Sequence, residues 1–235
     1  GADLVAYSGF TTSNYLEQPY NADLDFGTGD FCVMGWVSIS NTTENKIWLS
    51  RSNNVSASTS RILAKVNNGK AQIQIGDYIN LSGSTTVGIG TWKHCVFTRV
   101  GRTLSCYVDG VFETLSSGGT VEAFNASDTS SQTAIGVLNY SKATNFSTGS
   151  VALARISATA PSPEQIAKIY NDEKHLFQDG AQATLYGSSD AVTALAYDDT
   201  TELLHVGTSE GRSVFQGLRR VDNTTDAVGA AISAS

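Results

Sequence analysis

The 235-residue chain has little of several features that would each indicate a particular class of protein. Only 16% of its residues are charged, its net charge is −7, and no basic run exceeds Arg219-Arg220. Nucleic-acid binding needs a basic surface, so the composition argues against that partner. No apolar run approaches the roughly 20 residues that cross a bilayer, and the first residues lack the basic and then apolar layout of a signal peptide. The first residue is Gly rather than Met, from which we expect one module of a longer protein.

Cysteine is also scarce, with only Cys32, Cys95 and Cys106. In a hairpin with a two-residue turn, Cys95 lies opposite Val108 and Cys106 opposite Phe97. The two thiols are then diagonal neighbours on one face, too far apart for an easy disulfide. We therefore expect buried, reduced thiols, which favours assembly in a reducing compartment over disulfide-stabilised secretion.

Abundant Ser, Thr, Asn and Gly give the chain the composition of turn-rich β structure. The clearest element is a hairpin in which alternation over 92–99 is followed by a reversal at 100–103 and a return over 104–108. Asp109-Gly110 then accepts the positive φ of a second tight turn. The run Phe31–Val37 is apolar on both faces, which predicts a central strand covered on both sides. Further strands are expected over 15–19, 46–51, 61–66, 71–75, 78–81, 133–138 and 149–156, and their spacing predicts a two-sheet sandwich.

A helix and a distinct C-terminal region follow the sandwich. Ser162 is the expected N-cap, with Pro163 at the first helical position and Gln165 at the capping-box position. After about residue 183 the pattern changes to three short strands, over 192–197, 203–208 and 212–215. A lone three-stranded sheet is only marginally stable. We therefore expect this region to pack on the sandwich or on copies of itself in other subunits.

Three segments, in order, resemble the laminin-G-like branch of the concanavalin A-like jelly rolls. They are LDFGTGDFCVMGWV (24–37), similar to the family's opening strands, WKHCVFTRVGRTLSCYVDGV (92–111), similar to its central hairpin, and FSTGSVALARISATAPSPEQIAKIY (146–170), similar to its closing strand and helix. The resemblance implies an all-β fold, a concanavalin A-like jelly-roll β-sandwich with one C-terminal helix and a small C-terminal β meander. The expected domains are a laminin-G-like jelly roll over 1–180 and a β appendage over 181–235.

The resemblance also carries expectations about function. The family implies carbohydrate or glycoconjugate binding, often with a calcium ion near one rim of the sandwich. The segment after Gly180 resembles tail-end segments of bacteriophage virion proteins, in which lectin-like domains are common. We therefore expect a homo-oligomer, a trimer, located in a virion assembled in the host cytoplasm, with an extracellular location as the alternative.

The residues needed for catalysis are not arranged in the expected way. Polysaccharide-cleaving enzymes of this fold place two carboxylates about 5 Å apart from a Glu-x-Asp-x-x-Glu arrangement, and the sequence has no such spacing. It also lacks the paired ligand spacing of a zinc site. We predict that the chain is not an enzyme.

Binding residues can be proposed from chemistry alone. A sugar site combines an aromatic ring with amide and carboxylate groups that bind hydroxyls, and the Asn139-Tyr140-Ser141 loop is the strongest candidate because a Tyr among polar residues has no obvious packing partner. The full set of candidate ligand-binding residues is Trp48, Tyr78, Asn80, Asn139, Tyr140 and Asn145; for each aromatic, a core position is the alternative. Calcium takes about six to eight oxygen ligands from loops, and the candidates are Asp77, Asn125 and Asp128, with turn formation as the alternative.

The sequence thus predicts a noncatalytic lectin-like module of a phage virion or tail-fibre protein that contacts host surface glycans or polysaccharide. Calcium is the one candidate cofactor, and no nucleic-acid or membrane partner is expected. One alternative is a structural or assembly protein of a virion, acting by decoration or oligomerisation. A second alternative is a polysaccharide-cleaving enzyme of the same fold.

Overall fold

The computed structural model describes residues 6–42, 45–53, 59–77, 79–116, 121, 124–146, 149–177, 185–188, 191–217 and 219–229, without the side chains of 45 and 143–145. The chain divides into two compact units, Gly1–Asn171 and Asp172–Ser235. The division falls inside the helix α1 (Pro163–Glu173), whereas the sequence placed it at residue 180. None of the described helices is long and apolar enough to cross a membrane.

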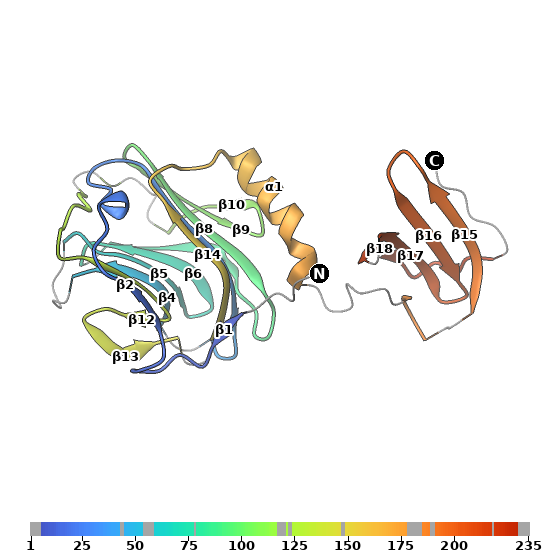
Figure 1. Ribbon diagram of the computed structural model, residues 1–235, viewed down its shortest axis with the longest axis horizontal. Coiled ribbons are helices and arrows are strands. Elements are labelled where there is room, and N and C mark those ends of the chain that lie inside the picture. The colour runs from blue at the N-terminus through green and yellow to red at the C-terminus, as the bar shows by residue number, and fades with distance from the viewer. Residues whose placement is uncertain are drawn as a thin grey trace. The chain divides into compact units, whose positions relative to one another are not determined.

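In the described residues, the first unit is a sandwich of two antiparallel six-stranded sheets (Figure 1). Sheet A has the order β1-β14-β3-β8-β9-β10, and its strands are β1 (Tyr7–Ser8), β14 (Gly149–Ser157), β3 (Phe31–Ile39), β8 (Lys93–Val100), β9 (Thr103–Val108) and β10 (Val111–Glu113). Sheet B has the order β2-β11-β4-β5-β6-β7, and its strands are β2 (Leu16–Gln18), β11 (Gln132–Ile135), β4 (Asn45–Ser52), β5 (Ile62–Asn67), β6 (Lys70–Ile75) and β7 (Ile79–Thr86). A short hairpin, β12 (Val137–Leu138) and β13 (Ser141–Asn145), and a 3-10 helix η1 (Ala22–Leu24) complete the unit. The predicted jelly-roll sandwich is confirmed.

The central hairpin has the predicted register. Cys95 pairs with Val108 and Cys106 with Phe97, and the left-handed φ values of 53° and 78° at Asp109-Gly110 make the turn into β10. All three cysteines are free and buried. Burial raises the pKa of the Cys32 thiol to about 12, so the thiols are packing groups rather than nucleophiles.

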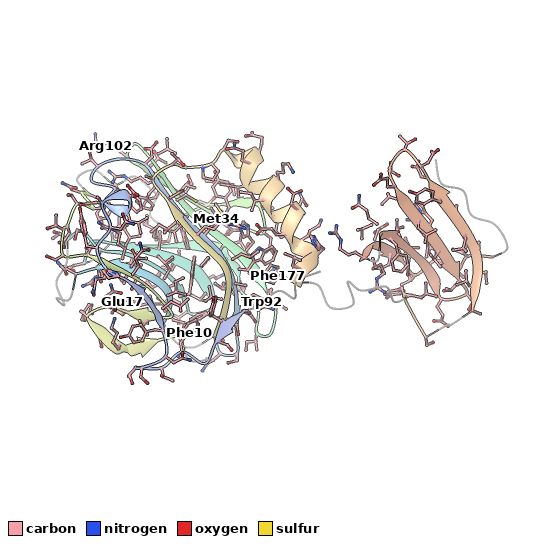
Figure 2. All side chains as sticks on the ribbon, in the orientation of Figure 1. Phe10, Glu17, Met34, Trp92, Arg102 and Phe177 are labelled. Carbon is pink, nitrogen blue, oxygen red and sulfur yellow. The ribbon has the colours of Figure 1, made fainter. Side chains whose placement is uncertain are left out.

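Strand β3 is apolar on both faces because it is covered on both. One face contributes to the core between the sheets, and the other packs under α1, where Cys32 and Met34 belong to one buried cluster with Ile166. Figure 2 labels Met34 on this side of the sheet. The helix begins with the predicted capping box: Ser162 N donates to Gln165 Oε1 (2.8 Å) and Gln165 N to Ser162 Oγ (3.3 Å).

A carboxylate joins the two sheets at the side formed by β7 and β10. Glu113, 5% exposed, accepts backbone N–H groups of Ser84 and Thr85, each at 2.7 Å, and hydrogen bonds from both hydroxyls. Burial alone would raise the pKa of Glu113, but these hydrogen bonds outweigh it and lower the pKa below its usual value. Glu113 therefore binds edge strand β7 as an anion.

Gly136 allows the close approach of the N-terminal segment to the β11–β12 junction. Its φ is +86°, a left-handed conformation, and a Cβ at this position would lie 2.0 Å from Phe10 Cδ1. Only glycine fits this position without displacing the buried Phe10 ring.

The second unit contains the 3-10 helix η2 (Lys174–Phe177) and a four-stranded antiparallel meander among its described residues: β15 (Val192–Asp198), β16 (Leu203–Thr208), β17 (Gly211–Gln216) and β18 (Arg219–Thr224). The prediction of three strands was wrong by one, because Arg219-Arg220 and the polar residues after it lack the apolar alternation of a strand. Among its described residues, the buried apolar side chains are Val206, Val214 and Phe215, whereas Leu195 and Tyr197 on the edge strand β15 are each 61% exposed.

Candidate functional site

The outer face of sheet B, which points away from sheet A, carries polar side chains in the middle of the sheet. In β5, Ile62, Ala64 and Val66 belong to the core between the sheets, so Leu63 and Lys65 occupy the opposite face. The same alternation in β6 and β7 places Gln72, Gln74, Asn80 and Ser82 on that outer face, with Ala71, Ile73, Ile75 and Leu81 inside.

Hydrogen bonds connect these side chains across three strands. Gln72 Nε2 donates to Ser82 Oγ at 2.6 Å. Lys65 Nζ donates to Gln74 Oε1 at 2.9 Å and to Asn80 Oδ1 at 2.8 Å. Although it lies on the outer face, Lys65 is only 3% exposed, whereas Asn80 is exposed. The network thus runs from a buried ammonium group to an amide at the surface.

At one end of sheet B the network meets charged and aromatic residues. Gln74 Nε2 donates to the backbone carbonyl of Asp77 (3.1 Å), and the Asp77 carboxylate lies 3.7 Å from the Arg61 guanidinium. That guanidinium also lies over the Tyr140 ring, 4.8 Å from its centroid. We call the residues Tyr140, Arg61, Asp77, Gln74, Lys65 and Asn80 the polar strip.

Three of the sequence-predicted residues belong to the polar strip. Tyr140 (37% exposed) and Asn80 present their side chains to solvent, as a ligand site requires. Asp77, proposed as a calcium ligand, is paired with Arg61 instead. The structure thus brings Tyr140, Asn80 and Asp77 together through the cations and amides between them.

Two other predicted ligand residues are structural. Trp48 is 0% exposed and belongs to the core between the sheets, so its ring offers no surface to a sugar. Asn139, 3% exposed, accepts from Ser50 Oγ (2.5 Å) and donates to the carbonyls of Ser52 (3.2 Å) and Gln132 (2.7 Å). Its amide fixes the β12–β13 turn onto sheet B, and the prediction that it contacts ligand is corrected.

The remaining two candidates cannot be located with their side chains. Tyr78 lies outside the described residues, and the Asn145 backbone is in β13 but its side chain is not among those described.

The proposed calcium ligands do not converge. Asp128 Oδ2 accepts from Asn53 Nδ2 (2.7 Å) and Ser60 Oγ (3.0 Å), and Asn125 Oδ1 accepts the N–H of Ser127 in a turn. Burial alone would raise the pKa of Asp128. Hydrogen bonds from Ser130 N, Ser60 and Asn53 outweigh this effect, so the pKa lies below its usual value. In the part of the chain that the structure describes, no group of three His, Cys, Asp or Glu side chains is placed to hold a metal ion. The turn-forming alternative describes these residues better than calcium coordination.

Sequence reasoning missed Arg61, Lys65 and Gln74, the buried half of the polar strip. A signal for Lys65 and Gln74 was present: polar and apolar residues alternate along β6 and in the second half of β5, although both strands lie inside a sheet. Such alternation indicates a strand with one face on the core and the other face outside it, so the polar side chains of neighbouring strands share that outer face.

A separate cavity of about 210 Å³ is lined by residues of β2, β4, β11 and β14. The lining residues are Leu16, Glu17, Gln18, Leu49, Thr133, Ile135, Ala154, Arg155 and Ile156. Five of its nine lining residues are aliphatic, so it suits hydroxyl groups less well than the polar strip does.

Two antiparallel sheets in this strand order, with a helix on the back of sheet A, define a jelly-roll protein of the lectin and glucanase type. The chain belongs to the concanavalin A-like lectin/glucanases superfamily, whose Laminin_G_3 family matches residues 10–167. A comparison with curated protein sequences found no match.

Solved structures with a similar fold include parts of larger proteins, and the chain spans less than a third of the sialidases that it matches. Trypanosoma rangeli sialidase in complex with 2,3-difluorosialic acid is 16% identical (TM-score 0.55), and the match covers 75% of this chain but 28% of the sialidase. The CBM40 of the Ruminococcus gnavus IT-sialidase, bound to α2,3-sialyllactose, is 10% identical (TM-score 0.53; 72% of this chain, 100% of that one). A heptameric SAP-like pentraxin from Limulus polyphemus is 11% identical (TM-score 0.53; 70% and 80%). At these identities the likeness establishes the fold.

Proposed function

We propose that this chain is a noncatalytic lectin-like module that binds glycans through the polar strip. The observation that carries the proposal is the Tyr140 ring, partly exposed and held in place by the Arg61 guanidinium, beside the exposed Asn80 amide. An oriented aromatic ring stacks on the apolar face of a sugar, and amides exchange hydrogen bonds with its hydroxyls. The CBM40 of similar fold is bound to a sialylated sugar, which supports the same use of the fold here.

The carboxylates near sheet B favour binding over catalysis. Asp77 faces Arg61, Glu17 pairs with Lys142, and Asp128 accepts hydrogen bonds from Asn53 and Ser60. A glycosidase needs one carboxyl group that donates a proton and a second that acts as nucleophile or base, both directed at one sugar bond. Carboxylates held by separate partners suit recognition better.

We further propose that the module is part of a bacteriophage virion, in a tail fibre that contacts glycans or polysaccharide on the host surface. This rests on the resemblance of the region after Gly180 to phage virion segments. The net charge of −7 supports a partner other than nucleic acid.

Calorimetric titration of the chain with a panel of bacterial surface polysaccharides tests glycan binding. Tyr140→Ala is expected to weaken the affinity about tenfold, because losing a stacked aromatic contact costs on the order of 1–2 kcal/mol. Tyr7→Ala is the matched control, since Tyr7 is also exposed (52%) but lies in sheet A. The proposal would be contradicted if the wild-type chain bound no polysaccharide of the panel, or if the two variants had equal affinities.

The second unit favours an additional assembly function. Its edge strand β15 exposes Val192, Leu195 and Tyr197 (48%, 61% and 61%), while three apolar residues are buried among its described strands. Because a small sheet with so little core is marginal alone, we propose that these residues pack against other copies of the chain in a trimer.

Light scattering on the full chain tests this second proposal. The double variant Leu195→Asp/Tyr197→Asp is expected to reduce a trimeric mass to a monomeric one, whereas Val111→Asp, at an exposed apolar residue (65%) of the first unit, leaves it unchanged. A monomeric wild-type chain would count against the assembly function.

A further inference from the structure

Lys65 is a buried cation whose surroundings offer no negative charge. It lies on β5, an interior strand of sheet B, directly opposite Ile47 on β4 and Gln72 on β6. Its two hydrogen-bond acceptors, Gln74 Oε1 and Asn80 Oδ1, are neutral amide oxygens. Among the described residues, no carboxylate lies within ion-pair distance of Lys65 Nζ.

A buried ammonium group without a counter-ion is unfavourable, and charged side chains in protein interiors are normally paired. Burial, with a smaller contribution from the like charge of Arg61, lowers the pKa of Lys65 to about 8. The group therefore remains mostly protonated at pH 7, and a positive charge persists beneath the exposed Asn80.

The polar strip as a whole is positive on an acidic protein. It holds two cations, Arg61 and Lys65, and one carboxylate, Asp77, which faces Arg61 at 3.7 Å. Its formal charge is therefore +1, whereas the chain carries −7. A ligand with one negative charge would complete the local balance of charge.

We infer that the polar strip selects sugars that carry a carboxylate, and that Lys65 Nζ is the group that binds this carboxylate. The inference rests on the proposed glycan-binding function and names the substrate class of the same site. A carboxylate that replaces Asn80 Oδ1 accepts a charge-assisted hydrogen bond from Lys65, which is stronger than the bond to a neutral amide. Tyr140, which is 37% exposed, remains available for the sugar ring.

The test compares an acidic polysaccharide, polygalacturonic acid, with the same polymer after chemical reduction of its carboxyl groups to alcohols. Calorimetry at pH 7 and fixed ionic strength measures the affinity of the full chain for each. The wild-type chain is expected to bind the acidic polymer about tenfold more tightly, the size of one charge-assisted hydrogen bond. Sodium acetate at the same carboxylate concentration separates recognition of the sugar from recognition of a free carboxylate, and strong competition by acetate would overturn the inference.

Three variants assign the selectivity to Lys65. Lys65→Met and Lys65→Gln are expected to bind both polymers within about twofold of each other, with affinity for the reduced polymer retained. Lys168→Met removes the same charge from an exposed position on α1 and is expected to keep the tenfold preference. Retention of the preference in both Lys65 variants overturns the inference.

The two proposals fail in different ways. Equal wild-type affinity for the acidic and the reduced polymer overturns the carboxylate selectivity but leaves glycan binding intact. Absence of binding to either polymer, and to the wider polysaccharide panel, overturns both.

Discussion

Replacing Lys65 by methionine is expected to stabilise the first unit, although the substitution removes two hydrogen bonds from a buried position. Methionine has nearly the length of lysine without its charge, so it fills the space on β5 between Ile47 and Gln72. Replacing a buried charge by an apolar residue of similar volume is often neutral or stabilising.

The magnitude follows from the pKa. A fall from 10.5 to about 8 means that the charged form of Lys65 is disfavoured in the folded state by roughly 3 kcal/mol. Methionine leaves Gln74 Oε1 without its donor, which costs about 1–2 kcal/mol, whereas Asn80 is exposed and binds water instead. The expected net gain is about 1–2 kcal/mol, or a rise in Tm of about 3–6 °C.

The pH dependence distinguishes this cause from better packing. Below pH 8 both the folded and the unfolded states hold the Lys65 proton, so the full penalty is present. Between pH 8 and 10.5 the unfolded state holds more protons than the folded state. The free energy of unfolding of the wild-type chain therefore increases relative to that of the variant as the pH rises. The advantage of Lys65→Met is expected to be largest at pH 7 and to be lost by pH 10, where most of the penalty has disappeared but the cost of the missing Gln74 donor remains.

Urea denaturation followed by tryptophan fluorescence measures the effect. All three tryptophans, Trp36, Trp48 and Trp92, lie in the first unit, so their signal follows that unit alone. Lys168→Met, at an exposed site, is expected to change the free energy of unfolding by less than about 0.5 kcal/mol. A loss of more than about 1 kcal/mol in the free energy of unfolding of Lys65→Met at pH 7 would contradict this prediction. A difference in the free energy of unfolding between variant and wild type that does not change with pH would contradict it as well.

Three further predictions concern residues that hold the first unit together. Gly136→Ala combines a left-handed φ with a Cβ 2.0 Å from the Phe10 ring, and thermal unfolding should show a loss above about 3 kcal/mol. Asn139→Ala removes three buried hydrogen bonds and should lower the free energy of unfolding by about 2–3 kcal/mol, while titration of the folded protein shows unchanged glycan affinity. Glu113→Gln should be destabilised by about 1–2 kcal/mol at pH 7; because the folded pKa of Glu113 is lowered, its stabilisation is present above the usual pKa and is lost as the pH falls through the folded value, so urea midpoints of variant and wild type should converge in acid.

Local patterns predicted the frame of the first unit well. The Cys95–Val108 register followed from the turn length alone, and the capping box of Ser162 and Gln165 required only neighbouring residues. In each case the interactions that decide the structure lie within a few residues along the chain, so alternation and turn chemistry are sufficient.

The candidate site was predicted less completely because it depends on contacts across strands. A register shift in β4 between Ile47 and Leu49 turns both Trp48 and Leu49 into the core, which simple alternation does not show. The contact of Lys65 with Gln74 and Asn80 joins three strands, and it emerges only once their registers are known. The exposure of Tyr140, in contrast, could be predicted from the sequence, because its neighbours in the short turn are polar and offer no packing partner.

The hydrogen bonds between Glu113 and β7 also affect how these molecules behave when crowded together. A strand at the margin of a sheet can pair with a strand of another molecule, which is a common route to aggregation. By occupying the amide hydrogens of Ser84 and Thr85, the carboxylate leaves β7 fewer donors with which to recruit a foreign strand. The first unit is protected at this margin, whereas β15 ends the sheet of the second unit with apolar residues exposed. We therefore expect contacts between molecules to form at the C-terminal sheet rather than at β7.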